Sequence, residues 1–214
     1  MLTVHHLRIS QSERIVWLCE ELGLDYTLKL YDRRTDNRLA PDDYKALHPM
    51  GIAPVIEDAI DGQRLVLGES GAIIEYIVAK HGGGRLVPTS DDADFAGHLF
   101  WFHFANGTMM TNGMMAIAAT QAGATEMPPF VADRTRKAWA MAEQRLGEAD
   151  YFGGRQLTTA DIMMGFQLTT SRAFNNMSLD TMPNIKAYLQ RIGQRPAYQR
   201  AMAKAEPGMP PKLD

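Results

Sequence analysis

The sequence is poor in cysteine and has no long apolar run. Cys19 is the one cysteine among 214 residues, so the chain has no internal disulfide and no Cys-x-x-Cys pair. This excludes a dithiol redox cycle run by the chain alone and fits a reducing, cytoplasmic location. The longest apolar run, Met114–Ala119, is far shorter than the ~18 residues of a membrane span. We therefore expect no membrane partner.

Basic charge and metal-ligand motifs are also scarce. The 22 basic and 25 acidic residues give a net charge of −3, which disfavours binding to nucleic acid through a basic surface. No His-Glu-x-x-His, P-loop or Gly-x-Gly-x-x-Gly pattern occurs, and the spacing of His98 and His103 does not put them on one helix face. We predict neither a nucleic-acid partner nor a metal.

The residues up to Lys80 alternate between strand-like and helix-like segments. Two strands, Leu2–His6 and Tyr26–Tyr31, flank a helix whose apolar residues recur at helical spacing at 15, 18, 19 and 22. Ser10-Gln11-Ser12-Glu13 has the pattern of a capping box before that helix. Cys19 belongs to the apolar stripe, so we interpret it as a core residue. The helical crossover predicts that the two strands are parallel.

A short helix over 41–47, a hairpin and a third helix complete this half. The hairpin strands, Pro54–Glu57 and Arg64–Leu67, are separated by the turn signal Asp61-Gly62. Ser70 can cap the third helix. The predicted order is βαβαββα, which makes a small mixed sheet covered by helices.

From His81 onward every periodic segment is helical. Residues 82–90 are rich in helix-stopping residues and mark a linker. We predict an α+β domain over 1–81 and an all-α domain over 91–214. The expected helices run from 91–94 through 104, over 130–146, from a capping box at Thr158–Asp161 to about Arg172, and over 183–192 and 196–203. The helix after Thr158 is apolar and should be central and buried.

Three N-terminal segments and two C-terminal ones resemble the glutathione transferase family. The segments are Ser10-Gln11-Ser12-Glu13-Arg14 before the helix at 17–23, His48-Pro49-Met50-Gly51-Ile52-Ala53-Pro54-Val55-Ile56, Glu69-Ser70-Gly71-Ala72-Ile73, Thr158–Asp161 and Arg195-Pro196. Their order and spacing carry the resemblance over nearly the whole chain. It implies a thioredoxin-like domain followed by an all-helical domain, and usually a homodimer that includes the long helix after Asp91. Within this family, the chain resembles the bacterial and fungal members of the serine type.

The resemblance assigns Ser10 as the hydrogen-bond donor to the glutathione thiolate. Ser10 precedes the first helix, where a hydroxyl and the positive end of the helix both favour an anion. A serine here is equally expected as a helix N-cap, and the two roles compete for one hydroxyl. Ser12 and His6 are the alternatives. Tyrosine-type relatives use a residue near the end of the first strand, where this chain has His5 and His6.

The resemblance also implies where the glutathione backbone binds. Pro54 would follow a cis peptide bond, and Ala53 would offer its N–H and C=O to the cysteinyl unit. Ser70 and the start of its helix would bind the γ-glutamyl carboxylate, and Glu69 would pair with the amine. Without the family, these residues are a strand-start proline, a helix cap and a favourable helix-end charge.

One position departs from the family pattern. Many relatives carry Lys or Arg at position 52, and this chain has Ile52. The glycyl carboxylate must then bind elsewhere, and the candidates are His48, Arg33, Arg38 and Lys45. The hydrophobic substrate is expected between the 7–9 loop and the long helix, beside Phe104, Thr108, Met109 and Met110. Each of these could equally fill the core or the dimer interface.

The predicted function is a glutathione transferase that adds the activated thiol to small hydrophobic electrophiles, as in detoxification. Glutathione is then a co-substrate, and no metal is needed. One alternative is a non-catalytic module of the same fold that carries hydrophobic ligands or docks another protein. Another is a glutathione-dependent peroxidase or disulfide reductase.

Overall fold

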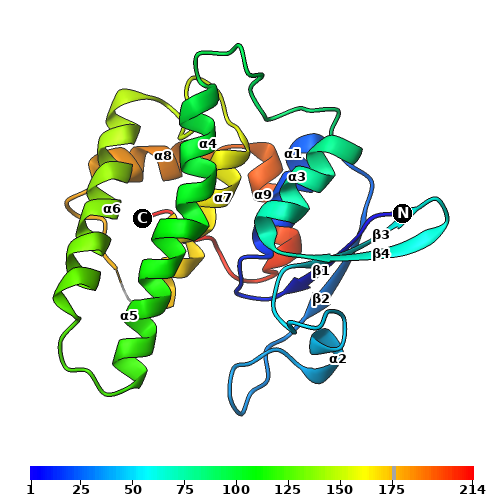
Figure 1. The fold of residues 1–214 in the computed structure, drawn as a ribbon, viewed down its shortest axis with the longest axis horizontal. Coiled ribbons are helices and arrows are strands. Elements are labelled where there is room, and N and C mark those ends of the chain that lie inside the picture. Colours follow the sequence, from blue (N-terminus) through cyan, green and yellow to red (C-terminus); the bar gives the residue numbers. More distant parts are fainter. Residues whose placement is uncertain (175–176) are drawn as a thin grey trace.

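A four-stranded mixed sheet and a bundle of helices make up the computed structural model, which describes residues 1–174 and 177–214 (Figure 1). The sheet has the order β2-β1-β3-β4. The N-terminal elements are β1 (Thr3–Leu7), α1 (Glu13–Leu22), β2 (Thr27–Tyr31), α2 (Asp42–Lys45), β3 (Val55–Ile60), β4 (Gln63–Gly68) and α3 (Ser70–Lys80). The predicted order βαβαββα is confirmed.

Local turn chemistry explains the sheet. β1 pairs with β2 in parallel, as the crossover through α1 requires, and with β3 antiparallel. The β3–β4 hairpin turns at Asp61 and Gly62, whose φ angles of 51° and 78° suit a tight type I′ turn. Gly23 ends α1 at φ 62°, and its N–H bonds back to the last turn.

The second part is helical. Its elements are α4 (Phe95–Phe104), the π-helical segment η1 (Ala105–Met110), α5 (Thr111–Gln121), α6 (Pro129–Glu148), α7 (Thr159–Leu168), the 3₁₀ segment η2 (Thr170–Phe174), α8 (Pro183–Gly193) and α9 (Pro196–Ala205). The expected capping box at Thr158 and Asp161 is confirmed. Within the described part of the chain, no helix is long and apolar enough to cross a bilayer.

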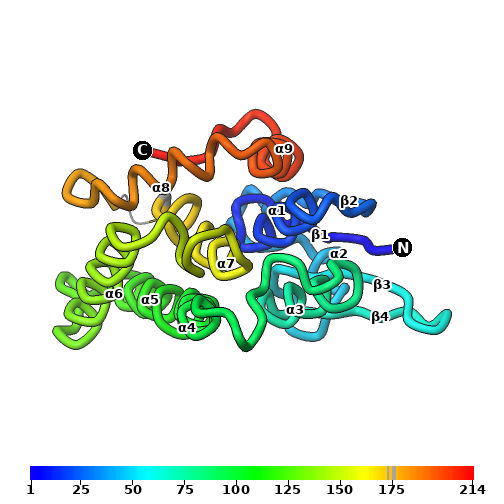
Figure 2. The backbone as a smooth tube through the Cα atoms, turned by 90° about the horizontal axis from the view of Figure 1, so that it is seen from above, coloured from blue at the N-terminus to red at the C-terminus, as the bar shows by residue number. Residues whose placement is uncertain are grey.

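Helix α7 is the centre of the molecule. All ten of its residues are buried, as predicted, and it packs against α1 and α4 (Figure 2). The expectation that this helix continues to Arg172 is wrong, because the α-helix ends at Leu168. Thr169 leaves helical geometry, and the Thr170 hydroxyl turns to donate to the Glu13 carboxylate at 2.6 Å. Helix α9 returns from the helical part to lie along α1.

We predict that Gly165→Ala destabilises the protein although alanine favours helices. A Cβ at position 165 would lie 2.7 Å from Cζ3 of Trp17. That ring is held by a hydrogen bond to Glu21 and by edge-on packing against Tyr198, so it has little room to move. Overpacking of this kind costs about 1–3 kcal/mol, more than the ~1 kcal/mol of helix propensity gained.

Gly113→Ala in α5 is the matched control, because a Cβ there meets open space. Its free energy of unfolding should stay level or rise by up to ~1 kcal/mol. Urea unfolding of both variants measures the difference. Equal stabilities would contradict close packing of α1 against α7.

Candidate functional site

Ser10 lies in the turn between β1 and α1, and its hydroxyl contacts neighbouring groups of this turn. The Ser10 Oγ lies 2.7 Å from both the Leu7 carbonyl and Ser12 Oγ, either of which can accept its one hydrogen, and it accepts the Ser12 N–H at 3.2 Å. The capping-box expectation for Ser10 and Glu13 is wrong. Ser12 occupies the N-cap position without a side-chain cap, and the Glu13 carboxylate accepts hydrogen bonds from Thr170 and, at 3.4 Å, Thr169.

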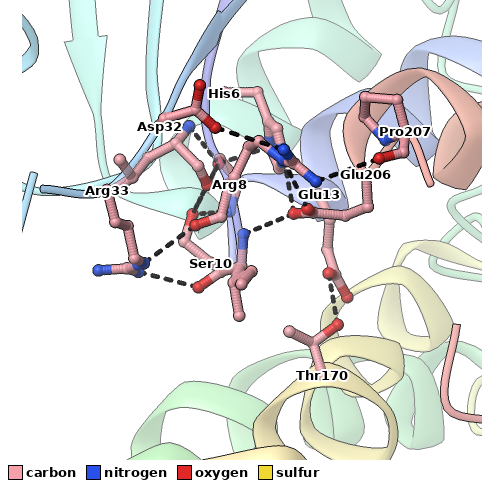
Figure 3. A network of polar contacts seen from close by, with 12 residues as sticks. His6, Arg8, Ser10, Glu13, Asp32, Arg33, Thr170, Glu206 and Pro207 are labelled. Carbon is pink, nitrogen blue, oxygen red and sulfur yellow. Dashed lines mark hydrogen bonds and ion pairs between the residues drawn. The ribbon is translucent and has the colours of Figure 1, made fainter. Parts of the chain in front are cut away.

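The three candidates for the residue nearest the thiolate form one connected group. Ser12 Oγ lies 2.7 Å from Ser10 Oγ and 2.8 Å from His6 Nδ1. The other ring nitrogen of His6, Nε2, lies 3.0 Å from Glu206 Oε1 (Figure 3). Sequence reasoning missed Glu206, which is 200 positions away from His6 and has no local signal.

The loop before Ser10 has an unusual backbone. Ile9 has a φ of 55°, which is an outlier for a β-branched residue and stores strain. Its N–H donates to Glu206 at 2.5 Å, and its carbonyl accepts from Arg33 at 2.8 Å. Arg33 also donates to the carbonyls of Arg8 and Arg38. The Arg33 guanidinium therefore holds this loop in place.

A second polar cluster surrounds Ser70 at the start of α3. Ser70 Oγ accepts from Arg14 Nη1 at 3.0 Å and from Asn106 Nδ2 at 3.1 Å, and lies 3.4 Å from Gln11 Oε1. Ser70 is the first residue of α3 and Glu69 takes the N-cap position, so the expectation that Ser70 caps α3 is wrong. Its hydroxyl faces the cluster, and the free N–H groups of α3 begin beside it.

Arg14 is the residue that sequence reasoning left without a role. It is fully buried, and burial lowers the pKa of its guanidinium to about 9 despite the nearby Glu13. Its Nε and Nη2 have no hydrogen-bond partner among residues 1–174 and 177–214. The sequence held one signal that Arg14 is buried: it lies one helical turn before Leu18 and therefore shares the apolar face of α1. Arg14 Nη1 bonds Gln11, Ser70 and Asn106, and the guanidinium carbon lies 5.2 Å from the centre of the Phe166 ring. No carboxylate is bonded to this buried cation among the described residues, so its charge favours an anion nearby.

Glu69 and Ala53 border this cluster. Glu69 is exposed at a strained φ of 67°, and its carboxylate has no hydrogen bond or ion pair within the described residues. The Ala53–Pro54 peptide bond is cis, as the resemblance implied. The Ala53 carbonyl accepts a hydrogen bond from Gln11 Nε2 at 3.0 Å. Gln11 therefore connects the Ala53 backbone to Ser70.

Two of the four expected hydrophobic-substrate residues are buried and two are half-buried. Phe104 and Met109 belong to the main core, whereas Thr108 and Met110 are half-buried. The π-helical segment η1 carries Asn106 toward Ser70, and such segments are common at functional sites. Cys19 is buried in the core, and burial raises the pKa of its thiol to about 12. Among the described residues, no cluster of metal ligands exists.

We expect Glu13 to make stability depend on pH. Burial raises the pKa of its carboxyl to about 7, and the Glu206 charge adds to this shift, against the hydrogen bond from Thr170. Between pH 4.5 and 7 the unfolded chain loses this proton while the folded protein keeps it. The free energy of unfolding should therefore fall with rising pH by about 1.4 kcal/mol per unit, roughly 3 kcal/mol in all.

The variant Glu13→Gln removes this titration and keeps the side-chain size. Its stability relative to the wild type should rise between pH 5 and 7 and then level off. Urea unfolding of both proteins across this range makes the comparison. Parallel stability curves would show that Glu13 is ionised in the folded protein.

Comparisons with known proteins cover nearly the whole chain and agree on one family. Residues 10–80 match the family model "Glutathione S-transferase, N-terminal domain", and residues 107–196 match "Glutathione S-transferase, C-terminal domain". The chain is 31% identical to glutathione S-transferase 3 of Schizosaccharomyces pombe, covering 96% of this chain and 88% of that protein. It is 27% identical to the disulfide-bond oxidoreductase YfcG of Escherichia coli, covering 97% of each.

A crystal structure of a glutathione S-transferase from Actinobacillus pleuropneumoniae is also similar. Its TM-score is 0.84 at 32% identity, covering 96% of this chain and 93% of that one. The thioredoxin-like domain followed by an all-α domain, expected from the sequence, is therefore confirmed.

Proposed function

The chain belongs to the glutathione S-transferase family and is an enzyme of that family, and on this premise we propose that it ionises the glutathione thiol and transfers it to small hydrophobic electrophiles. The observation that carries the proposal is the anion site at the start of α3. Ser70 and the buried, half-unpaired Arg14 meet there, beside the exposed and unpartnered Glu69.

The γ-glutamyl end of glutathione fits this site by charge. Its carboxylate would bind Ser70 and the free N–H groups at the positive end of α3. The guanidinium of Arg14, whose Nη1 bonds Ser70, would add positive charge behind this carboxylate. Glu69 would pair with the amine, which sits next to the carboxylate in the same unit. Both ends of a zwitterion are then matched by opposite charges.

The cysteinyl unit would lie along Ala53, whose backbone N–H and C=O would pair with it as a short added strand. The Gln11 amide donates to the Ala53 carbonyl in this structure, and it would share this acceptor with the ligand or move away from it. This brings the thiol toward Ser10 at the start of α1. There, a hydroxyl donor and the helix dipole lower the thiol pKa, and each unit requires about 1.4 kcal/mol of preferential stabilisation of the thiolate.

The glycyl carboxylate would bind Lys45. Of the four candidates, Arg33 is occupied with three backbone carbonyls, and the His48 ring packs against Gly68 and accepts the Met50 N–H. Arg38 is exposed and is the alternative to Lys45. Lys45 lies against Gly51 in the loop that carries Ile52, and only the exposed Asp42 shares its ammonium group. A lysine from α2 would thus replace the basic residue missing at position 52.

We assign glutathione binding to residues 1–81, and the hydrophobic substrate to 91–214 after the 82–90 linker. Thr108 and Met110 are the accessible members of the expected pocket. We further propose a cytoplasmic homodimer. The exposed side chains of Leu99 and Phe100 on α4 support an interface there, since paired subunits would bury them.

Glutathione-dependent disulfide reduction is a second candidate. The similarity to the E. coli disulfide-bond oxidoreductase favours it. Because Cys19 is buried with a raised thiol pKa, such a reaction would use only glutathione thiols. Parallel assays with an aromatic halide and with a small disulfide rank the two activities. Glutathione binding without either activity would favour the non-catalytic module.

Ser70→Ala should weaken glutathione binding about 5- to 150-fold, which corresponds to ~1–3 kcal/mol for a hydrogen bond to a charged group. The exposed linker variant Ser90→Ala is the control and should bind like the wild type. Calorimetric titration measures both, after unfolding curves establish that the variants are folded. Equal affinities for all three proteins would remove Ser70 from the site.

Ser10→Ala should raise the thiol pKa of bound glutathione. Activity should fall at neutral pH and recover at high pH, where the thiolate forms without help. Ultraviolet thiolate absorbance of the complex, followed against pH, reports the shift directly. Superimposable titrations of wild type and Ser10→Ala would mean that another group stabilises the thiolate.

A further inference from the structure

A continuous chain of hydrogen bonds leads from Ser10 into the protein and ends on a carboxylate. It runs from Ser10 Oγ to Ser12 Oγ at 2.7 Å, on to His6 Nδ1 at 2.8 Å, and from His6 Nε2 to Glu206 Oε1 at 3.0 Å. All four side chains are buried. Glu206 follows α9, so the far end of the sequence reaches the proposed catalytic loop (Figure 3). The proposed function gives no role to this chain beyond Ser10.

The donors and acceptors determine how the chain is ordered. Burial would raise the pKa of the Glu206 carboxyl. The hydrogen bonds from His6, the Ile9 N–H and Arg8 outweigh burial and hold this pKa below its ordinary value. The ionised carboxylate can only accept, so His6 Nε2 carries a hydrogen. In a neutral ring His6 Nδ1 then accepts, and Ser12 donates to it. The Leu7 N–H donates to Ser12 Oγ at 3.1 Å. The single Ser10 hydrogen has two acceptors at 2.7 Å, the Leu7 carbonyl and Ser12 Oγ, and the relay uses the arrangement in which Ser10 donates to Ser12.

We propose that this chain is a proton relay in which His6 accepts the thiol proton of glutathione through Ser10 and Ser12, and Glu206 stabilises the imidazolium that forms. The proposal rests on the proposed function, because it needs glutathione at Ser10. A serine hydroxyl cannot hold an extra proton at neutral pH, whereas an imidazole can take one up there. The carboxylate behind the ring fixes its tautomer and balances its charge, as the aspartate of a Ser-His-Asp triad does.

The transfer conserves every proton. The S–H bond of glutathione breaks, and its proton forms an O–H bond on Ser10. The former Ser10 proton passes to Ser12, and the Ser12 proton forms the N–H bond at His6 Nδ1. The products are a thiolate facing the Ser10 hydroxyl and an imidazolium paired with Glu206. No electron is transferred, and the net charge of the complex does not change.

The surrounding charges leave Glu206 available for this role. Arg8 Nε binds Oε2 of Glu206 at 3.2 Å, so Oε1 remains for His6 and the Ile9 N–H, and Asp32 pairs with Arg8 at 3.3 Å. Arg33 is bound to carbonyls of the same loop. Glu13 approaches from α1, and its raised pKa keeps it largely protonated below neutral pH.

His5 provides a matched control one residue away. It is equally buried on β1, and alternation along the strand sends its ring to the other face. There the ring bonds the Tyr31 hydroxyl at 2.9 Å and lies 3.2 Å from Glu57. His5 thus lies near a carboxylate, as His6 does, but its Nε2 makes no hydrogen bond among the described residues and the ring has no link to the serines. His6→Asn changes a residue of the proposed relay, and His5→Asn makes the same chemical change outside it.

The test measures how many protons leave the complex for each thiolate formed. Thiolate is quantified by ultraviolet absorbance on binding glutathione at neutral pH. Released protons are counted by calorimetry in two buffers with different protonation enthalpies. The wild type and His5→Asn should release well under one proton per thiolate. His6→Asn and Ser12→Ala should release about one, because the proton then goes to solvent.

Glu206→Gln keeps a side chain that can accept from Ile9 but removes the negative charge. Its proton release should rise toward that of His6→Asn, and an unchanged value would exclude Glu206 from the relay. A full proton released by the wild type, or equal values for His5→Asn and His6→Asn, would overturn the relay while leaving a functional Ser10 site. If the wild type forms no thiolate at all, the proposed function itself fails.

Discussion

The burial of α1 is the constraint on which the rest of the site depends. Nine of its ten residues are buried, because the sheet, α7 and α9 all pack around it. Polar groups on such a helix must find partners inside the protein. Glu13 meets threonines at the end of α7, Arg14 reaches Ser70, and Glu20 and Glu21 pair with basic residues of α9 and its N-cap, Arg195. The same burial that stabilises the fold thereby directs Arg14 toward Ser70, where we propose that an anion binds.

In the proposed function, the starts of two helices bind different parts of one charged ligand. The start of α3 would offer free N–H groups, Ser70 and Glu69 to a zwitterion, and the start of α1 would offer Ser10 to a thiolate. Gln11 lies between them, bonded to the Ala53 carbonyl and close to Ser70. Strain at Ile9 and Glu69 borders both sites, which is where backbone strain commonly serves function.

The C-terminal segment is part of this site as well as of the helical domain. Glu206 holds the strained Ile9 N–H and the His6 ring at once, and the Pro207 carbonyl accepts from Arg8. A change in the packing of α9 would therefore reach the Ser10 loop without touching a ligand. The Ser10 loop is therefore positioned by both ends of the chain, and the proposed site needs the sheet and the helical bundle together.

The sequence by itself determined the features that depend on neighbours three or four residues apart. These are the βαβαββα order, the Asp61-Gly62 hairpin turn, the buried apolar helix α7 and the Thr158–Asp161 capping box. The family motifs also implied the cis Ala53–Pro54 bond, which is confirmed, whereas the binding of glutathione by Ser70 and Glu69 stays a prediction. The capping-box pattern at Ser10–Glu13 gave a wrong prediction. The Glu13 carboxylate accepts hydrogen bonds from Thr169 and Thr170, which are 156 and 157 residues further along the chain, instead of from the Ser10 N–H. The roles of Arg14, Asn106 and Glu206 were likewise decided only by tertiary structure. A buried polar group takes whichever partner folding brings to it, and that partner has no fixed place in the sequence.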